Sequence, residues 1–208
     1  MKYHHEVSYW ELIKNGIISE NIIFRLALSL CPALAVTSKV KYGLLMGIAV
    51  LFVHTMVGIT VSLIRRFIHQ KIRLPIFMLI IATWVTVTDL MMAAYAREAY
   101  AVMGLYIQLI VAFASILARA EMFGSKNPVM PSMFDGIGMG LGFLIALVTI
   151  SFFRELLGSG SVFGFQIVDT RPVFIMMLPT GGFFAVGILM ACFNWIDRKY
   201  SKKKSSTH

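Results

Sequence analysis

The chain has 208 residues, of which 58% are hydrophobic and only 14% are charged. Its mean hydropathy of +0.79 is far above that of a domain whose core is covered by polar side chains. A soluble globular protein is therefore excluded, and an integral membrane protein is expected. The net charge of +9 indicates membrane topology and contact with anionic lipid headgroups, and nucleic-acid binding is not expected.

A membrane-spanning helix needs about 20 predominantly apolar residues. Six stretches come close to that length, so we predict an all-α integral membrane protein with six transmembrane helices. They cover residues 22–37, 42–64, 74–95, 99–118, 137–157 and 173–196. Residues 1–21 are polar and of mixed charge, without a visible cleavable signal peptide, so the first apolar stretch should itself direct insertion.

Lys and Arg in short connecting segments are concentrated on the cytoplasmic side of a membrane. When both termini are placed in the cytoplasm, most basic residues fall inside. The exceptions are Lys39, Lys41, Arg97, Arg154 and Arg171, with Arg25 near the start of the first span left uncounted. We therefore predict a multi-pass protein with both termini cytoplasmic. Residues 1–21 form a cytoplasmic or interfacial lead-in, and residues 198–208 form a basic tail.

The two halves of the chain resemble each other, and each carries three apolar stretches. The matching pairs are 30–37 with 113–120, 43–50 with 140–147, and 72–78 with 170–176. An odd number of spans per half places the second half upside down relative to the first. We predict a first three-helix repeat at residues 22–95 and a second, inverted repeat at residues 96–197.

Helices 1 and 4 of this arrangement are predicted to be broken. Pro32 follows Cys31 in the short first stretch, and proline removes a backbone donor and disfavours helix in the residue before it. The matching segment of the second half is 114–120. Paired broken helices in inverted repeats indicate a site near the membrane midplane, and the alternative is an ordinary proline kink.

Four segments carry a more specific pattern. Residues 30–37 read LCPALAVT, 119–123 read RAEMF, 135–140 read DGIGMG, and 154–160 read RELLGSG. With these motifs the chain resembles the E subunits of the Rnf electron-transport complexes. That family also includes the equivalent small membrane subunits of the sodium-pumping NADH:quinone reductase, and the resemblance covers roughly residues 26–197.

The resemblance implies a membrane component of an ion-translocating ferredoxin:NAD oxidoreductase, which acts as part of a redox-driven translocase and is not an enzyme alone. Implied partners are an inverted pseudo-symmetric A subunit, the flavin-bearing D and G subunits, and the peripheral B and C subunits. The implied location is the cytoplasmic (inner) membrane of a prokaryote. In this family, two cysteines from each of the A and E subunits hold one intramembrane [2Fe–2S] cluster, and electron transfer through it is coupled to Na⁺ or H⁺ transport.

The first family cysteine falls on Cys31, whereas the second falls on Ala114, which has no donor atom. The neighbouring Ser115 would be a harder ligand than a thiolate and would point about 100° away on a helix. Cys192 lies in the wrong part of the last span. Because a [2Fe–2S] cluster needs four ligands, three alternatives stay open: three cysteines with some other ligand, a cluster-free homologue, or a chain altered at Ala114.

Several other polar residues lie in or beside the apolar stretches. Asp89 is a candidate for an ion pathway, because a carboxylate within a membrane is costly unless it faces the bundle interior. Its alternative role is capping or outward snorkelling. Ordinary structural roles are expected elsewhere: helix-end pairing or snorkelling for Arg119, Glu121, Arg154 and Glu155, helix N-capping for Asp135, and an interior position for His54. Flavin and NAD are expected on partner subunits, because no strand precedes the glycines that follow Asp135.

Two further functions are compatible with the sequence. One is a cluster-free structural scaffold in the same kind of complex, which the alanine at position 114 favours. The other is a secondary transporter that moves a solute between its own inverted repeats, and no obvious charged solute site supports it.

Overall fold

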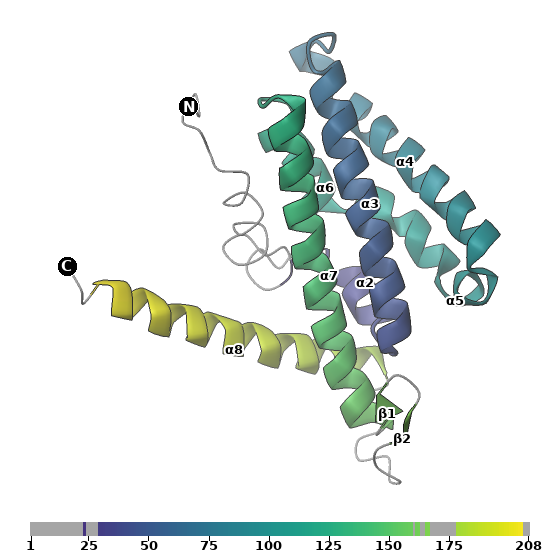
Figure 1. The fold of residues 1–208 in the computed structure, drawn as a ribbon, viewed down its shortest axis with the longest axis vertical. Coiled ribbons are helices and arrows are strands. Elements are labelled where there is room, and N and C mark those ends of the chain that lie inside the picture. Colours follow the sequence, from purple (N-terminus) through teal and green to yellow (C-terminus); the bar gives the residue numbers. More distant parts are fainter. Residues whose placement is uncertain (1–22, 24–28, 160, 163–164, 167–177, 206–208) are drawn as a thin grey trace.

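The computed structural model describes residues 23, 29–159, 161–162, 165–166 and 178–205 (Figure 1). Helices form almost all of the regular structure in this part of the chain. The α-helices are α2 (Leu30–Ala35), α3 (Val40–Ile64), α4 (Arg73–Tyr95), α5 (Arg97–Gln108), α6 (Ala114–Arg119), α7 (Val129–Ser159) and α8 (Pro179–Ser205). Short 3₁₀ segments η2 (Gln70–Ile72) and η3 (Leu109–Ala112) and a π-helical turn η4 (Ala120–Gly124) lie between them. A small antiparallel pair of strands, β1 (Ser161–Val162) and β2 (Phe165–Gln166), follows α7.

Four helical stretches of the described chain are long and apolar enough to cross a membrane. They are Val40–Ile64, Arg73–Tyr95, Arg97–Gly124 and Val129–Gly158, and α8 adds a shorter apolar stretch at Thr180–Trp195. The expected first span, 22–37, lies partly outside the described residues. The structure thus confirms a helical membrane-protein fold with several helices long and apolar enough to span a membrane. The count of six spans and the inverted relation of the two halves stay predictions.

The second and third predicted spans agree closely with α3 and α4, but the fifth begins earlier than predicted. Helix α7 starts at Val129, so Asp135 lies inside it, and the expected N-cap role of Asp135 is wrong. Pro131 does not prevent this early start, because the first-turn N–H groups of a helix have no intrahelical partner to lose.

The breaks in the first and fourth apolar stretches also lie slightly away from their predicted places. Ser29, just before α2, has a positive φ of 59°, and Phe113, just before α6, is extended with φ −70° and ψ 107°. Pro32 is the third residue of α2, where the first turn tolerates proline. Ser29 is therefore not in a right-handed helical conformation, and α2 begins at Leu30, before the Cys31–Pro32 pair. Helices α2 and α6 each have six residues.

Helices α3 and α7 run antiparallel along each other and form the centre of the bundle (Figure 1). Glycines bring their backbones close: a Cβ atom on Gly47 would lie 3.0 Å from the Cα of Leu144, and one on Gly140 would lie 2.7 Å from the Cα of Leu51. Small residues allow such close approach between membrane helices. The fully buried side chains around this contact include Met46, Val53, Met139, Phe143 and Leu147.

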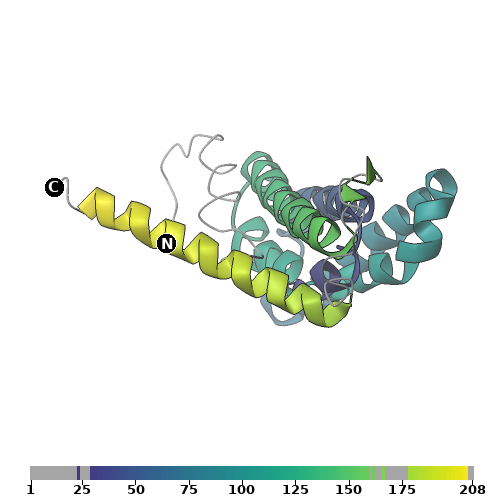
Figure 2. The same cartoon turned by 90° about the horizontal axis from the view of Figure 1, so that it is seen from below.

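Helix α8 leaves the bundle at a steep angle to α7, as Figures 1 and 2 both show. It contacts α7 and α2, and its large apolar side chains Phe183, Phe184, Ile188 and Trp195 are exposed. The predicted sixth span corresponds to this helix. In the single chain α8 does not lie alongside α7, because the described residues offer its apolar surface little to pack against.

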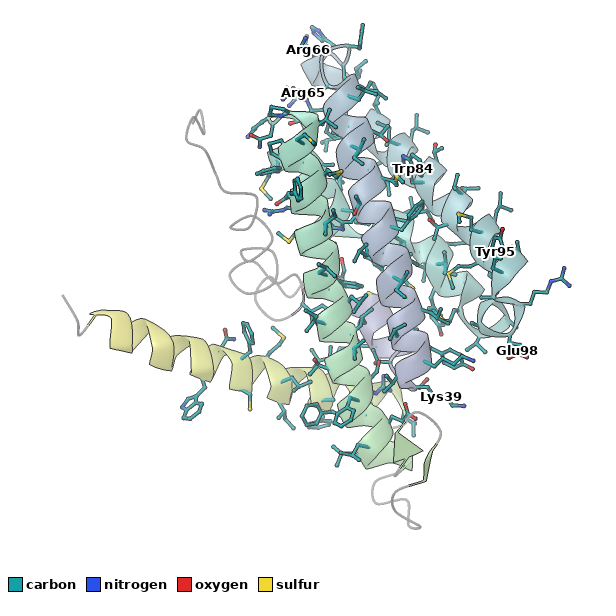
Figure 3. The ribbon with its side chains drawn as sticks, viewed as in Figure 1. Lys39, Arg65, Arg66, Trp84, Tyr95 and Glu98 are labelled. Carbon is teal, nitrogen blue, oxygen red and sulfur yellow. The ribbon has the colours of Figure 1, made fainter. Side chains whose placement is uncertain are left out.

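Basic side chains gather where α3 ends and where α4 and α7 begin. Arg65 and Arg66 lie at this end of the bundle, and Lys39 and Glu98 lie at the opposite end (Figure 3). Between the ends, Trp84 donates a hydrogen bond from Nε1 to Thr60 Oγ1 at 3.0 Å. This distribution of charged residues agrees with successive helices that cross the membrane in opposite directions. The assignment of the more basic end to the cytoplasm stays a prediction.

The close contact of α3 and α7 predicts a strong effect of one added methyl group. Gly140→Ala should force the helices apart, because the new Cβ would lie 2.7 Å from the Cα of Leu51, at a cost of about 1–3 kcal/mol. Thermal unfolding of the detergent-purified protein measures this loss. Gly187→Ala on α8 is the matched control, since no atom lies within 4 Å of its Cβ position. Equal melting temperatures for the two variants would contradict the packing described here.

Candidate functional site

The two six-residue helices α2 and α6 meet near their first residues. Ser29 and Ser115 share a hydrogen bond between their hydroxyl oxygens at 2.9 Å, although they are 86 residues apart in the chain. Ser29 lies two residues before Cys31, and Ser115 lies one residue after Ala114. The hydrogen bond therefore joins the two segments in which the family cysteines are expected.

Cys31 and Ala114 themselves are exposed in the single chain, whereas Ser115 is buried. The hydroxyl of Ser115 is hydrogen-bonded to Ser29. It is therefore used within the chain and is not presented beside Cys31 as a further ligand for a cluster. Cys192 lies on α8 and is also exposed. Its position gives no reason to group it with Cys31.

This donor set bears directly on the expected cluster. Among the described residues, no three His, Cys, Asp or Glu side chains are grouped so that they could hold a metal ion. One exposed thiol fits a cluster that takes its other ligands from a neighbouring protein chain, and it does not fit a cluster held by this chain alone. The three alternatives that follow from Ala114, which are a cluster with a non-cysteine ligand, a cluster-free homologue and a chain altered at this position, therefore stay open.

Arg154, near the end of α7, holds the far end of the helix that carries Cys31. Its Nη1 donates hydrogen bonds to the carbonyl oxygen of Leu34 at 2.6 Å and to Thr37 Oγ1 at 2.7 Å. Its Nη2 donates to the carbonyl oxygen of Leu178 at 3.2 Å, just before α8. A positive charge at the C-terminal end of a helix is favourable, because carbonyl groups there lack intrahelical partners. Arg154 therefore positions α2 and the start of α8 together.

Glu155 caps the N-terminal end of α3. Its Oε2 accepts a hydrogen bond from the backbone N–H of Val40, the first residue of α3, at 2.7 Å. The preceding residue, Lys39, offers no side-chain cap. Arg154 and Glu155 are only 3% and 5% exposed, so the expectation that they snorkel outward is wrong, whereas both do bind backbone groups at helix ends. They point inward because the broken chain around α2 leaves backbone groups that need partners.

A second buried polar group lies where α6 ends. Arg119 Nη2 and Asp135 Oδ1 form an ion pair at 2.6 Å, while Glu121 on the adjoining turn is exposed. Arg119 and Asp135 line a small cavity together with His54 and Ser132. The sequence signal for this cluster was available in the charged residues of the apolar stretches, but their pairing across 16 residues and a change of helix was not predicted.

Asp89 occupies a different part of the bundle. It lies near the end of α4, where its Oδ2 accepts a hydrogen bond from Tyr100 of α5 at 3.3 Å. It is half-buried and is not among the residues that line the cavity beside Arg119. The structure thus ties Asp89 to the α4–α5 connection, and its role in an ion pathway stays a prediction.

The hydrogen bonds of Arg154 predict how Cys31 responds to its loss. Arg154→Ala should loosen α2, because hydrogen bonds from a charged group contribute about 1.5–3 kcal/mol each. In a Cys192→Ser background, Cys31 should then react faster with a maleimide than in the same background with Arg154 retained. Arg97→Ala removes an exposed arginine and serves as the matched control. The same labelling rate in both variants would show that Arg154 does not position α2.

Comparison with known proteins places this arrangement in a family. A family model described as "Rnf-Nqr subunit, membrane protein" matches residues 9–190. The E subunit of the proton-translocating ferredoxin:NAD(+) oxidoreductase complex of Clostridium ljungdahlii is 50% identical, over 94% of this chain and 92% of its own length. The Na(+)-translocating counterpart of Acetobacterium woodii is 40% identical over 93% of this chain and all of its own length. The E subunit of the ion-translocating oxidoreductase complex of Cellvibrio japonicus is 42% identical over 95% of this chain and 90% of its own length. The chain therefore belongs to the Rnf-Nqr family of membrane subunits.

Proposed function

We propose that this chain is the E subunit of an ion-translocating ferredoxin:NAD(+) oxidoreductase complex, contributing to catalysis only as part of that assembly. The observation that carries the proposal is the likeness to such subunits over nearly the whole of both chains. The matched region includes the segments around Cys31 and Arg154, which the structure joins through hydrogen bonds of Arg154 to α2.

The electron-transfer site we propose is a [2Fe–2S] cluster shared with the A subunit of such a complex, to which Cys31 contributes one thiolate. When bound, such a cluster takes up and releases one electron at a time. The residues of this chain hold the site in shape: Ser29 and Ser115 join the starts of α2 and α6, and Arg154 fixes the end of α2. Partner residues must supply the remaining ligands, since Ala114 has no donor atom.

We also propose that the two halves form inverted repeats and that the chain has six spans. Support comes from the paired six-residue helices after each break. The central contact agrees as well, because Gly47 and Leu144, which occupy matching positions of the two halves, approach each other. The expected setting is a prokaryotic cytoplasmic membrane with both termini inside. The A, D and G subunits and the peripheral B and C subunits are the expected partners, and the exposed apolar side chains of α8 offer a surface to lipid or to such a partner.

A cluster-free scaffold in the same complex is the second candidate function, and Ala114 is the specific observation that favours it. In that case the same contacts would serve assembly alone. The two functions differ in iron content and share one fold, so a single spectroscopic experiment separates them.

The decisive experiment is electron paramagnetic resonance on the dithionite-reduced complex of this chain with its A-type partner. We expect a [2Fe–2S] signal that Cys31→Ser abolishes or alters, because the substitution replaces a thiolate ligand with a poorer one. Cys192→Ser is the matched control and should leave the signal unchanged, since Cys192 lies on α8. Ala114→Cys should strengthen or sharpen the signal by restoring the second family thiolate. Absence of signal, iron and labile sulfide in the unsubstituted complex would establish the scaffold function instead.

A further inference from the structure

Five basic residues gather at one end of the bundle, from segments that connect its helices. Arg65 and Arg66 follow the last residue of α3 and lie at its tip (Figure 3). Lys71 lies in η2, Arg73 begins α4, and Lys126 lies between η4 and α7. Arg66, Lys71 and Lys126 are exposed, whereas Arg65 and Arg73 are half-buried. We refer to these five residues as the basic patch.

Hydrogen bonds join the segments that carry the basic patch. Ser62, in the last turn of α3, donates a hydrogen bond from Oγ to the carbonyl oxygen of Asn127 at 2.7 Å, across 65 residues of sequence. The backbone N–H groups of Lys126 and Asn127 both bond to the carbonyl oxygen of Phe123, at 3.1 and 3.0 Å. The loop with Lys126 is thereby fixed beside the end of α3. A surface that is already ordered loses little conformational entropy when a ligand binds to it.

The chain offers few acidic side chains to balance the basic patch. Residues 61–74 and 122–134 contain no Asp or Glu. Glu121 is exposed on η4, and Asp135 is paired with Arg119. Within the described part of the chain, none of the five basic side chains forms an ion pair. Since nearby like charges repel each other, the basic patch favours the binding of an anion.

An exposed apolar surface adjoins the basic patch. Phe67, next to Arg66, is 90% exposed, and Leu74 and Met78, one turn apart on α4, are exposed as well. Because α4 is long and apolar enough to span a membrane, its exposed face meets acyl chains and its first residue lies near the lipid headgroups. Basic residues next to exposed Phe and Leu are typical of surfaces that bind the membrane interface. A phospholipid matches both the charge and the apolar surface, whereas an acidic soluble protein matches the charge alone.

We propose that the basic patch binds the headgroup of an anionic phospholipid of the phosphatidylglycerol type. The phosphate lies among the exposed Arg66, Lys71 and Lys126, Phe67 enters the interface beside it, and the acyl chains follow the exposed face of α4. Each basic residue near an anionic lipid surface strengthens binding about fivefold. The site lies at the end of α3 away from α2 (Figure 1). It depends on the membrane-spanning fold and goes beyond the electron-transfer role proposed above.

A tryptophan placed in the turn after α3 reports which lipid lies there. The full-length chain with Phe67→Trp is reconstituted in phosphatidylcholine vesicles that contain increasing fractions of brominated phosphatidylglycerol or, for comparison, of brominated phosphatidylcholine. Bromine quenches tryptophan fluorescence on close contact. The chain without this substitution gives the signal of the three native tryptophans, which is subtracted. We expect phosphatidylglycerol to quench at clearly lower fractions than phosphatidylcholine, and the ratio of the two fractions is the lipid preference.

Removing the exposed charges of the basic patch should abolish this preference. The test variant carries three substitutions in the Phe67→Trp chain: Arg66→Gln, Lys71→Gln and Lys126→Gln. The preference should fall more than tenfold, at about fivefold for each charge. The matched control removes three exposed charges from the opposite end and should keep the preference: Lys39→Gln, Lys41→Gln and Arg97→Gln. Salt at about 1 M, where the Debye length is about 3 Å, should also reduce the preference in the unsubstituted patch.

Thermal unfolding checks that each variant is folded. If the triple variant is not, Lys71→Gln and Lys126→Gln are measured singly, and each should lower the preference about fivefold. Equal quenching by the two lipids with the unsubstituted patch overturns the inference, and so does a preference that the folded triple variant keeps. Equal quenching, together with loss of another subunit from the purified complex of the triple variant, would show that the patch binds an acidic protein instead. None of these outcomes depends on iron or NADH formation, so they leave the proposed function to its own test.

Discussion

The structure depends on one constraint, which is that every backbone polar group within a membrane needs a partner inside the protein. Unbroken helices such as α3 and α4 meet this need through their own hydrogen bonds. The chain around α2 does not, because Ser29 before it and residues 36–39 after it are not helical. Helix α7 supplies the missing partners: Arg154 binds the carbonyl oxygen of Leu34, and Glu155 binds the N–H of Val40.

This arrangement explains why two charged residues of opposite sign stand side by side within an apolar segment. The end of a helix presents carbonyl groups and the start of the next presents N–H groups, so a cation and an anion are needed within a few ångströms of each other. A charge buried this deeply destabilises a protein unless it is hydrogen-bonded. Arg154 therefore holds the end of α2, and Glu155 the start of α3, only while the bundle is intact, which couples the position of Cys31 to the packing of α3 against α7.

The same logic extends to α6, whose two ends make different contacts. Its start joins the segment before Cys31 through Ser29 and Ser115, and its end joins α7 through Arg119 and Asp135. The central pair of α3 and α7 is held at close range by glycines on both helices, so it forms a rigid frame. The short helices α2 and α6 join that frame through apolar side chains such as Leu34 and Ile116 as well as through these polar contacts.

Features that depend on local composition could be predicted from the amino-acid sequence. Hydropathy located α3 and α4 nearly to the residue, whereas the break predicted at Cys31–Pro32 was misplaced, because both residues lie inside α2. Motifs indicated the family and singled out Cys31 and Ala114.

Which groups meet was decided by the folded bundle alone. Ser29 and Ser115 are 86 residues apart, and Glu155 and Val40 are 115 residues apart. Such pairings depend on how the helices cross, and hydropathy carries no information about that. A charged residue in an apolar stretch lowers the mean hydropathy equally whether its side chain points outward or caps another helix. For that reason Arg154 and Glu155 were expected to snorkel outward and Asp135 to cap a helix, whereas the folded bundle buries all three.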